Sequence, residues 1–186
     1  MATAKRLASY DDLLELPENV VEEIIAGGLH THPRPAPAHV RASSALGIQV
    51  GNPFDLGGGG GPGGWWILDE PELHLDADIL VPDLAGWRRE RLPSLPQTAW
   101  FEVAPDWVCE VLSPATARTD RVLKLPRYAA AGVSHCWLID PDTRTVEAYA
   151  NQDGRWLLLG AWGGSDQAAI EPFAAIELEL SSLWVD

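Results

Sequence analysis

Residues 107–140 constrain the fold of this chain more than any other stretch, because a strand-like apolar run there contains a single carboxylate. The run WVCEVL carries Glu110 between apolar neighbours and leads into a Ser-Pro turn. A helical stretch that bears Lys124 follows, and a second apolar run ends at Asp140. Upstream, the short apolar run ILVPD ends at Asp83. Two acids and a lysine on strands and a helix form the arrangement that a metal-dependent phosphodiesterase needs.

The length of 186 residues suits one domain, and we expect a single domain over residues 1–186. Hydrophobic residues make up 46% and charged residues 22%, which is typical of a soluble globular protein. No apolar run approaches the ~18 residues of a membrane span, and the first residues lack the apolar core of a signal peptide. Cys109 and Cys136 lie in apolar runs, which favours buried thiols, although a disulfide is possible. We therefore predict a cytoplasmic protein without a membrane partner.

The formal net charge of −14 argues against a simple nucleic-acid binder, because affinity for a polyanion usually comes from a basic surface. Two short basic clusters flank the candidate site. An acidic body with a local basic rim is compatible with a nuclease in which a metal ion offsets the acids. The clusters are Arg88-Arg89-Arg91 and Arg118-Arg121-Lys124-Arg127.

The apolar periodicity predicts an α+β fold, with a twisted mixed sheet and helices packed mainly on one side. Pro126 lies inside the longest expected helix and predicts a kink, and Gly132 is expected to end that helix. The expected helices are 10–16, 39–50 and 117–131, whereas 20–25 could be helix or strand. The expected strands are 65–68, 73–75, 79–85, 100–103, 107–112, 135–140, 145–150, 155–159 and 175–180.

Residues 57–64, GGGGGPGG, form the one low-complexity segment, and we expect a flexible loop there. A phosphate-binding loop would need a following Lys-Ser/Thr and the start of a helix. The chain continues instead with WWIL, which is a strand pattern. The sequence therefore does not favour a phosphate-binding loop.

Alternation along a strand puts Val108, Glu110 and Leu112 on one face of the segment 107–112. A buried carboxylate is costly unless it is paired or bound to a cation. If the strands that carry Asp83 and Glu110 are neighbours, the two carboxylates could share one divalent metal ion. The alternative is that each acid caps a turn or pairs with an arginine, which suits Asp83 after its proline better than Glu110 in mid-strand.

Lys124 is unusual because only two of the 13 basic residues are lysines, Lys5 and Lys124. A compact ammonium can act as a point charge and proton carrier, which a planar guanidinium cannot do in the same way. The alternative is an ordinary i,i+4 pair with Asp120. Asp120, Lys124 and Tyr128 fall on one face of the expected helix.

Three segments of the chain resemble the Uma-type family of proposed restriction endonucleases, which belongs to the PD-(D/E)xK nuclease superfamily. The segments are PD at 82–83, PDWVCEVLSP at 105–114 and DRVLKLPRYAAAGVSHCWLIDP at 120–141. The resemblance implies a restriction endonuclease-like core, a mixed twisted sheet flanked by helices. The superfamily motif places its lysine two residues after the second acid, where this chain has Leu112. The Uma-type pattern has the lysine displaced onto the following helix, as here.

The resemblance also implies roles for individual residues. Asp83 and Glu110 would bind Mg²⁺ or Mn²⁺, and Lys124 would assist the attacking water. Further metal contacts would come from the Val111 backbone carbonyl and Glu23, which matches an N-terminal acid of such folds. The side chains expected to support the site from behind are Asp120, Tyr128 and His39. DNA is the expected substrate, and a homodimer is expected by analogy.

Other candidate sites are weaker. His30, His32 and His39 suggest a transition-metal site, but no cysteine or acid with ligand spacing completes it. Ser113 is expected in a turn rather than in a catalytic triad. The tryptophans could stack on bases, but packing is the better explanation for Trp107 and Trp137, which fall in core strands.

Three functions therefore remain open at the level of sequence. The first is a metal-dependent DNA endonuclease, in which Lys124→Ala abolishes cleavage with little loss of fold. The second is a catalytically silent nuclease-fold module that binds a partner, which the acidic charge favours. The third is a hydrolase of another phosphate ester that uses the same three residues.

Overall fold

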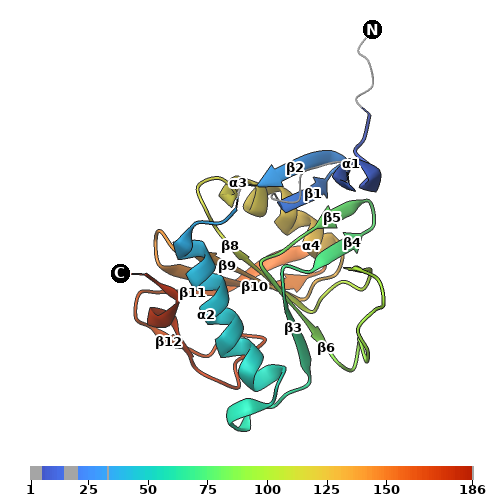
Figure 1. Cartoon of the computed structure of the whole chain (residues 1–186). Coiled ribbons are helices and arrows are strands. Elements are labelled where there is room, and N and C mark those ends of the chain that lie inside the picture. The colour runs from blue at the N-terminus through green and yellow to red at the C-terminus, as the bar shows by residue number, and fades with distance from the viewer. Residues whose placement is uncertain (1–5, 15–20, 33, 186) are drawn as a thin grey trace.

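The computed structural model describes residues 6–14, 21–32 and 34–185, and it has the predicted α+β architecture (Figure 1). A six-stranded sheet has the order β11-β10-β9-β8-β6-β3, a five-stranded sheet the order β2-β1-β5-β4-β7, and β12 pairs with β13. The six-stranded sheet is mixed, because β8 and β9 run parallel whereas its other pairs are antiparallel. The strands are β1 Val21–Ile25, β2 Gly28–His32, β3 Trp65–Asp69, β4 Glu72–Leu75, β5 Asp78–Leu80, β6 Leu84–Arg88, β7 Trp100–Phe101, β8 Trp107–Val111, β9 His135–Asp140, β10 Thr145–Gln152, β11 Arg155–Gly163, β12 Gln167–Ala168 and β13 Leu178–Glu179.

The helices are fewer than the strands. They are α1 Tyr10–Leu14, α2 Pro37–Phe54, α3 Ala117–Thr119, the π-helical turn η2 Asp120–Lys124 and α4 Leu125–Ala130, with 3₁₀ turns η1 Gly58–Gly60 and η3 Leu180–Leu183. The expected helix over 10–16 is present up to Leu14, and its remaining residues lie outside the described part of the chain. No helix in the described ranges is long and apolar enough to cross a membrane.

Two hydrophobic cores cover the two faces of the six-stranded sheet. Trp107, Cys109 and Val111 of β8 belong to the core shared with α2, whereas Val108 and Leu112 belong to the core shared with α4 and the five-stranded sheet. This is the predicted alternation. The expectation of helices mainly on one side was wrong, because α2 and α4 contribute to different cores. Amphipathic helices need an apolar surface to cover, and this sheet offers one on each face.

Trp107 and Trp137 confirm the packing interpretation of the tryptophans. Both are fully buried, and their rings meet edge to face at 5.2 Å between centroids. Cys109 and Cys136 are free and buried, as expected for small apolar side chains in neighbouring strands.

The predicted strand over 79–85 is wrong, because the chain forms two strands there in different sheets. β5 ends at Leu80 and β6 begins at Leu84, with Val81, Pro82 and Asp83 between them. Pro82 has no N–H for a ladder, so a break at this position is expected on physical grounds. The break turns the chain from one sheet to the other and leaves Asp83 at the junction. The strand predicted over 175–180 is likewise reduced to β13, and η3 follows it.

The predicted kink before Pro126 takes the form of a π-helical turn. The Leu125 amide bonds to the Asp120 carbonyl five residues back, and α4 then begins with Pro126 in its first turn. A wider turn suits a proline, which cannot donate and would crowd the preceding carbonyls. Gly132, at φ +83°, ends the helix as predicted, and the Val133 amide bonds to the Tyr128 carbonyl.

The glycine-rich segment lies against the end of α2. The Gly63 amide donates to the Pro53 carbonyl at 2.9 Å, and a Cβ on Gly61 would meet Pro53 atoms at 2.4 Å. Gly57 and Gly60 adopt positive φ, which side-chain-bearing residues rarely adopt. The glycines therefore allow the chain to turn in close contact with the end of α2 before β3 begins.

Candidate active site

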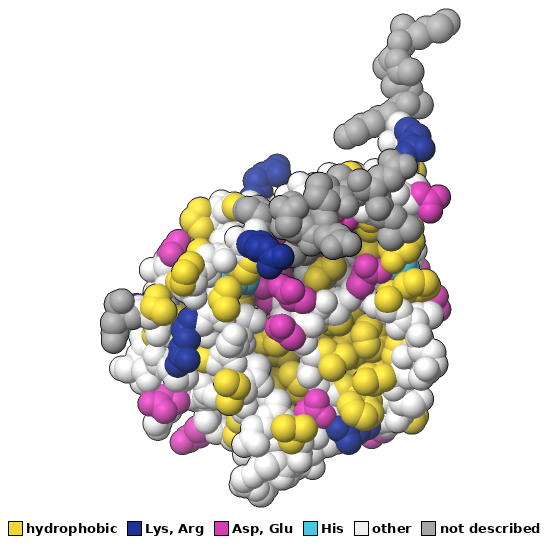
Figure 2. All heavy atoms as spheres, viewed as in Figure 1, with side chains coloured by type: hydrophobic (Ala, Val, Ile, Leu, Met, Phe, Trp, Pro, Cys, Tyr) yellow, Lys and Arg dark blue, Asp and Glu magenta, His cyan; other side chains and the backbone are white. Residues whose placement is uncertain are grey.

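A pocket of about 300 Å³ lies at one end of β8, and its walls come from both large sheets, α2 and η2. Most of its charged residues are acidic. Figure 2 also shows acidic side chains gathered near the centre of the face in view. The charged residues that line the pocket are Glu23, Arg34, Glu70, Asp83, Glu110, Asp120 and Lys124.

Glu110 lies in the middle of this polar cluster, on the face of β8 that is turned toward η2. Its Oε1 accepts hydrogen bonds from Lys124 Nζ at 2.8 Å and from the Tyr128 hydroxyl at 2.7 Å. All three side chains are buried. Burial raises the pKa of Glu110 well above its ordinary value, and Lys124 acts in the opposite direction. The isolated carboxylate in the sequence is therefore paired in the fold.

Lys124 lies in a cage of oxygen atoms. Its Nζ is 2.8 Å from Glu23 Oε1 and donates to the Val81 carbonyl at 3.0 Å, in addition to its bond with Glu110. Burial would lower the pKa of Lys124, but Glu110 and Glu23 raise it above its ordinary value. Asp120, the alternative helical partner, is 4.0 Å away. The contacts with Glu23 and Glu110 are therefore the closer ones.

Glu23 reaches the pocket from β1 of the five-stranded sheet. Its Oε1 also accepts the Val81 amide at 2.7 Å, and its Oε2 is 3.3 Å from His32 Nε2. Burial would raise the pKa of Glu23, but Lys124, His32 and the Val81 amide together lower it to about 2. Both carboxylate oxygens face donors of the protein, which favours a role in holding Lys124 over a role as a metal ligand.

Asp83 directly precedes β6, whose antiparallel register pairs Leu84 with Cys109 of β8, so the next step of that register would bring Asp83 opposite Glu110. Its Oδ2 accepts the Val111 amide at 2.7 Å, and its Oδ1 is 3.2 Å from His39 Nε2 at the start of α2. Burial would lower the pKa of His39, but Asp83 and the Val111 backbone raise it above its ordinary value. The amide and carbonyl of one strand residue point to the same side, so the Val111 carbonyl also faces Asp83.

These residues offer oxygen ligands, which Mg²⁺ and Mn²⁺ prefer. Within residues 6–14, 21–32 and 34–185, no group of three or more His, Cys, Asp or Glu side chains is arranged to hold a metal ion. Asp83, Glu110 and the Val111 carbonyl still fit Mg²⁺, which usually binds one or two carboxylates and keeps several waters. In the fold as it stands, Lys124 and His39 lie beside the two acids, so a metal ion would compete with them.

Asp120 makes the stability of the protein depend on pH. Burial raises the pKa of this carboxyl to about 6. An acid whose pKa rises on folding lowers stability above that pKa, and the loss is recovered as the pH falls from about 6 toward 4. Relative to Asp120→Asn, we expect the metal-free wild type to gain about 1 kcal/mol of unfolding free energy between pH 7 and pH 5. Denaturant titrations in EDTA would measure this, and a flat or opposite difference would contradict it.

The histidines and Ser113 do not form the alternative sites that were considered from the sequence. His32 lies beside Glu23 and His39 beside Asp83, on different elements, so the histidines do not converge on one ion among the described residues. Ser113 bonds through its hydroxyl to Thr116, as expected for a turn. Sequence reasoning did not find the contacts of the Val81 carbonyl and His32, because both depend on how the two sheets meet. It also did not identify Arg34 as a residue of the pocket, because the only unusual feature of Arg34 in the sequence is its position between two prolines.

A family model described as "Uma2: Putative restriction endonuclease" matches residues 7–182. The fold is similar to a crystal structure described as a "putative nuclease belonging to DUF820 from Anabaena variabilis ATCC 29413", with a TM-score of 0.70 and 24% sequence identity. The match covers 93% of this chain and 95% of the other, and at this identity it establishes the fold alone. Among curated proteins, none matches this sequence.

Proposed function

Since the chain belongs to the Uma2 family of restriction endonuclease-like proteins, we propose that it is a metal-dependent endonuclease that hydrolyses phosphodiester bonds in DNA. The observation that carries this proposal is that Asp83, Glu110 and Lys124 line one pocket, from the β5–β6 junction, β8 and η2. The residues are far apart in sequence, and all three were expected in a nuclease site from the sequence pattern.

Asp83 and Glu110 would hold Mg²⁺ or Mn²⁺, with the Val111 carbonyl as a further oxygen ligand. When bound, the ion would lower the pKa of a water molecule and offset the negative charge of the phosphate. The Val111 amide fixes the orientation of the Asp83 carboxylate, and the Tyr128 hydroxyl does the same for Glu110. Both hydrogen bonds leave less freedom for the acids to turn away from a shared ion.

Lys124 would orient the attacking water and stabilise the negative charge that develops on the phosphate. Its Nζ is held by Glu23 and the Val81 carbonyl, so its position does not depend on Glu110 alone. The displaced lysine thus reaches the second acid from η2, whereas Leu112 is buried in the core. Because a duplex has two strands to cut, we also propose that the protein acts as a homodimer.

The second candidate is a catalytically silent module of the same fold. The net charge of −14 favours it, because a surface of this sign repels nucleic acid at a distance. It differs from the nuclease in one measurable property, which is turnover.

Incubation of purified protein with supercoiled plasmid and Mg²⁺ or Mn²⁺ tests the proposal. We expect nicked and linear DNA in the presence of either ion, and none in EDTA or with Asp83→Ala. Cleavage that persists in EDTA or in the variant would contradict the assigned site. Absence of cleavage by the folded wild type with either ion would favour the silent module.

A further inference from the structure

A proline-rich segment brings the chain into α2 along the rim of the pocket. Arg34 precedes Pro35, and Ala36 precedes Pro37. A residue before proline is restricted to extended conformations, and each proline fixes its own φ. Ala36 has φ −69° and ψ 158°, in agreement with this restriction. Arg34, Pro35 and Ala36 all line the pocket, so a stiff piece of backbone forms part of its wall.

Arg34 is the exposed cation of this wall. The other basic residue among the described residues that line the pocket, apart from histidines, is Lys124, which is buried and held by Glu23 and Glu110. Glu70 also lines the pocket. Burial raises the pKa of Glu70, and Arg34 acts in the opposite direction. Among the ion pairs of the described residues, none includes Arg34.

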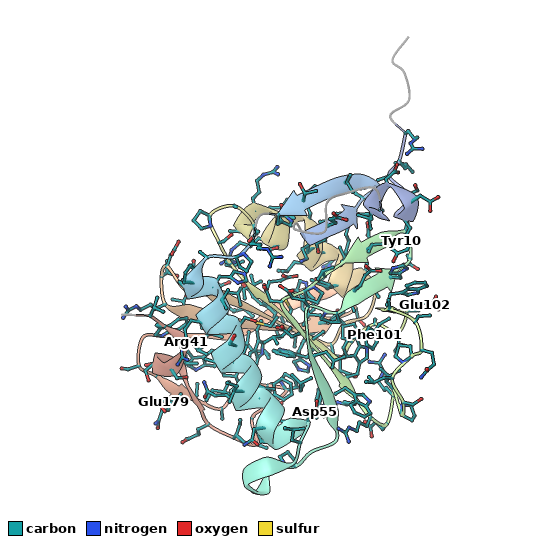
Figure 3. All side chains as sticks on the ribbon, in the orientation of Figure 1. Tyr10, Arg41, Asp55, Phe101, Glu102 and Glu179 are labelled. Atoms are coloured by element: carbon teal, nitrogen blue, oxygen red, sulfur yellow. The ribbon has the colours of Figure 1, made fainter. Side chains whose placement is uncertain are left out.

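Most other arginines already contact acidic, backbone or aromatic groups of the protein itself. Arg89 contacts Asp55, which follows α2 (Figure 3), at 2.6 Å, and its guanidinium stacks over Trp66. The two basic clusters of the sequence are therefore largely used within the protein and do not form a free basic rim. The remaining pairs from these clusters are Arg91–Asp106, Arg121–Glu147 and Arg127–Asp78.

We infer that Arg34 binds a backbone phosphate of the substrate next to the phosphate that is cleaved, an inference that rests on the proposed nuclease function. A guanidinium binds phosphate oxygens in a bidentate manner, and the stiff backbone reduces the entropy lost when it does so. The pocket acids repel a polyanion until a metal ion offsets them. The contact at the rim therefore has a large effect on substrate binding, although it lies outside the reacting group.

The test compares Arg34→Ala and Arg34→Lys with Arg155→Ala. Arg155 is also exposed, forms no ion pair among the described residues and is the first residue of β11. For DNA cleavage we expect Arg34→Ala to raise KM about 10-fold with little change in kcat, and Arg34→Lys to recover part of the loss. Arg155→Ala should match wild type in both constants.

Binding of a short duplex, measured by fluorescence anisotropy with Ca²⁺ in place of Mg²⁺, gives a readout that does not need cleavage. Loss of one phosphate contact should make the plot of log affinity against log salt shallower by about 0.9 for Arg34→Ala. A slope and an affinity equal to those of wild type would overturn the inference. Because this arm needs no turnover, it separates failure of the Arg34 contact from failure of the proposed nuclease activity.

A small diester such as bis(p-nitrophenyl) phosphate has no neighbouring phosphate. Arg34→Ala should therefore hydrolyse it with the same kinetic constants as wild type, while losing affinity for DNA. An equal loss on both substrates would place Arg34 at the reacting phosphate and would overturn the assignment to a neighbouring one.

Discussion

Lys124→Met is expected to abolish cleavage and to destabilise the metal-free protein by about 3–5 kcal/mol. The variant removes the ammonium that lies 2.8 Å from both Glu23 and Glu110 and leaves two buried carboxylates without their cation. Removal of one partner from a buried pair is costly because the remaining charge is not solvated. The sequence alone suggested a loss of activity with little loss of fold, and the burial of Lys124 changes that expectation. Chemical denaturation and plasmid cleavage would measure the two effects.

Arg121→Ala provides a matched control on the same turn. Arg121 pairs with Glu147 at 2.9 Å, but the Arg121 side chain is 39% exposed. Pairs of this kind contribute about 0–1 kcal/mol, so the variant should remain close to wild type in stability and activity. A Lys124→Met protein as stable as Arg121→Ala would show that the buried cluster does not depend on its cation. Full cleavage by Lys124→Met would remove the lysine from the mechanism.

Glu110→Gln is expected to lower kcat by about 10³-fold while changing stability far less than Lys124→Met. The amide keeps the size of the side chain and can still accept the Tyr128 hydroxyl, and it no longer carries the cost of a buried charge. Lys124 retains Glu23 as a partner. Affinity for Mg²⁺ should fall at least about 10-fold, because one of two carboxylate ligands is lost.

Single-turnover cleavage, metal titration and denaturation of Glu110→Gln would test these three expectations together. Glu147→Gln is the control, because Glu147 is a partly exposed acid on β10 outside the pocket. If both variants bind Mg²⁺ as wild type does, Glu110 is not a metal ligand. If Glu110→Gln unfolds as readily as Lys124→Met, the main role of the Glu110 carboxylate is to stabilise the fold.

The parts of the fold that follow from local pattern could be predicted. Alternation along 107–112 placed Glu110 on one face of the strand and Trp107 and Cys109 on the other face, and the structure has this arrangement. The helix end at Gly132 and the disturbance before Pro126 follow from backbone chemistry that a single sequence contains.

The parts that depend on distant segments could not be predicted in the same way. β1 and β5 belong to a second sheet, and only their pairing brings Glu23 toward Lys124. The run 79–85 is apolar throughout apart from its Pro-Asp step, so periodicity does not reveal that its two ends enter different sheets. Likewise, no local pattern shows that Asp83 bonds to the Val111 amide, because that contact forms only after β6 pairs with β8.

The proposed function rests on the claim that Asp83 and Glu110 share a divalent metal ion. Calorimetric titration of Mn²⁺ and Mg²⁺ into wild type and Asp83→Ala, with and without a short duplex, tests it most directly. We expect saturable binding to wild type, tighter when DNA contributes phosphate oxygens, and loss of that binding in the variant. Equal binding by both proteins, or no binding by folded wild type even with duplex present, would contradict the claim.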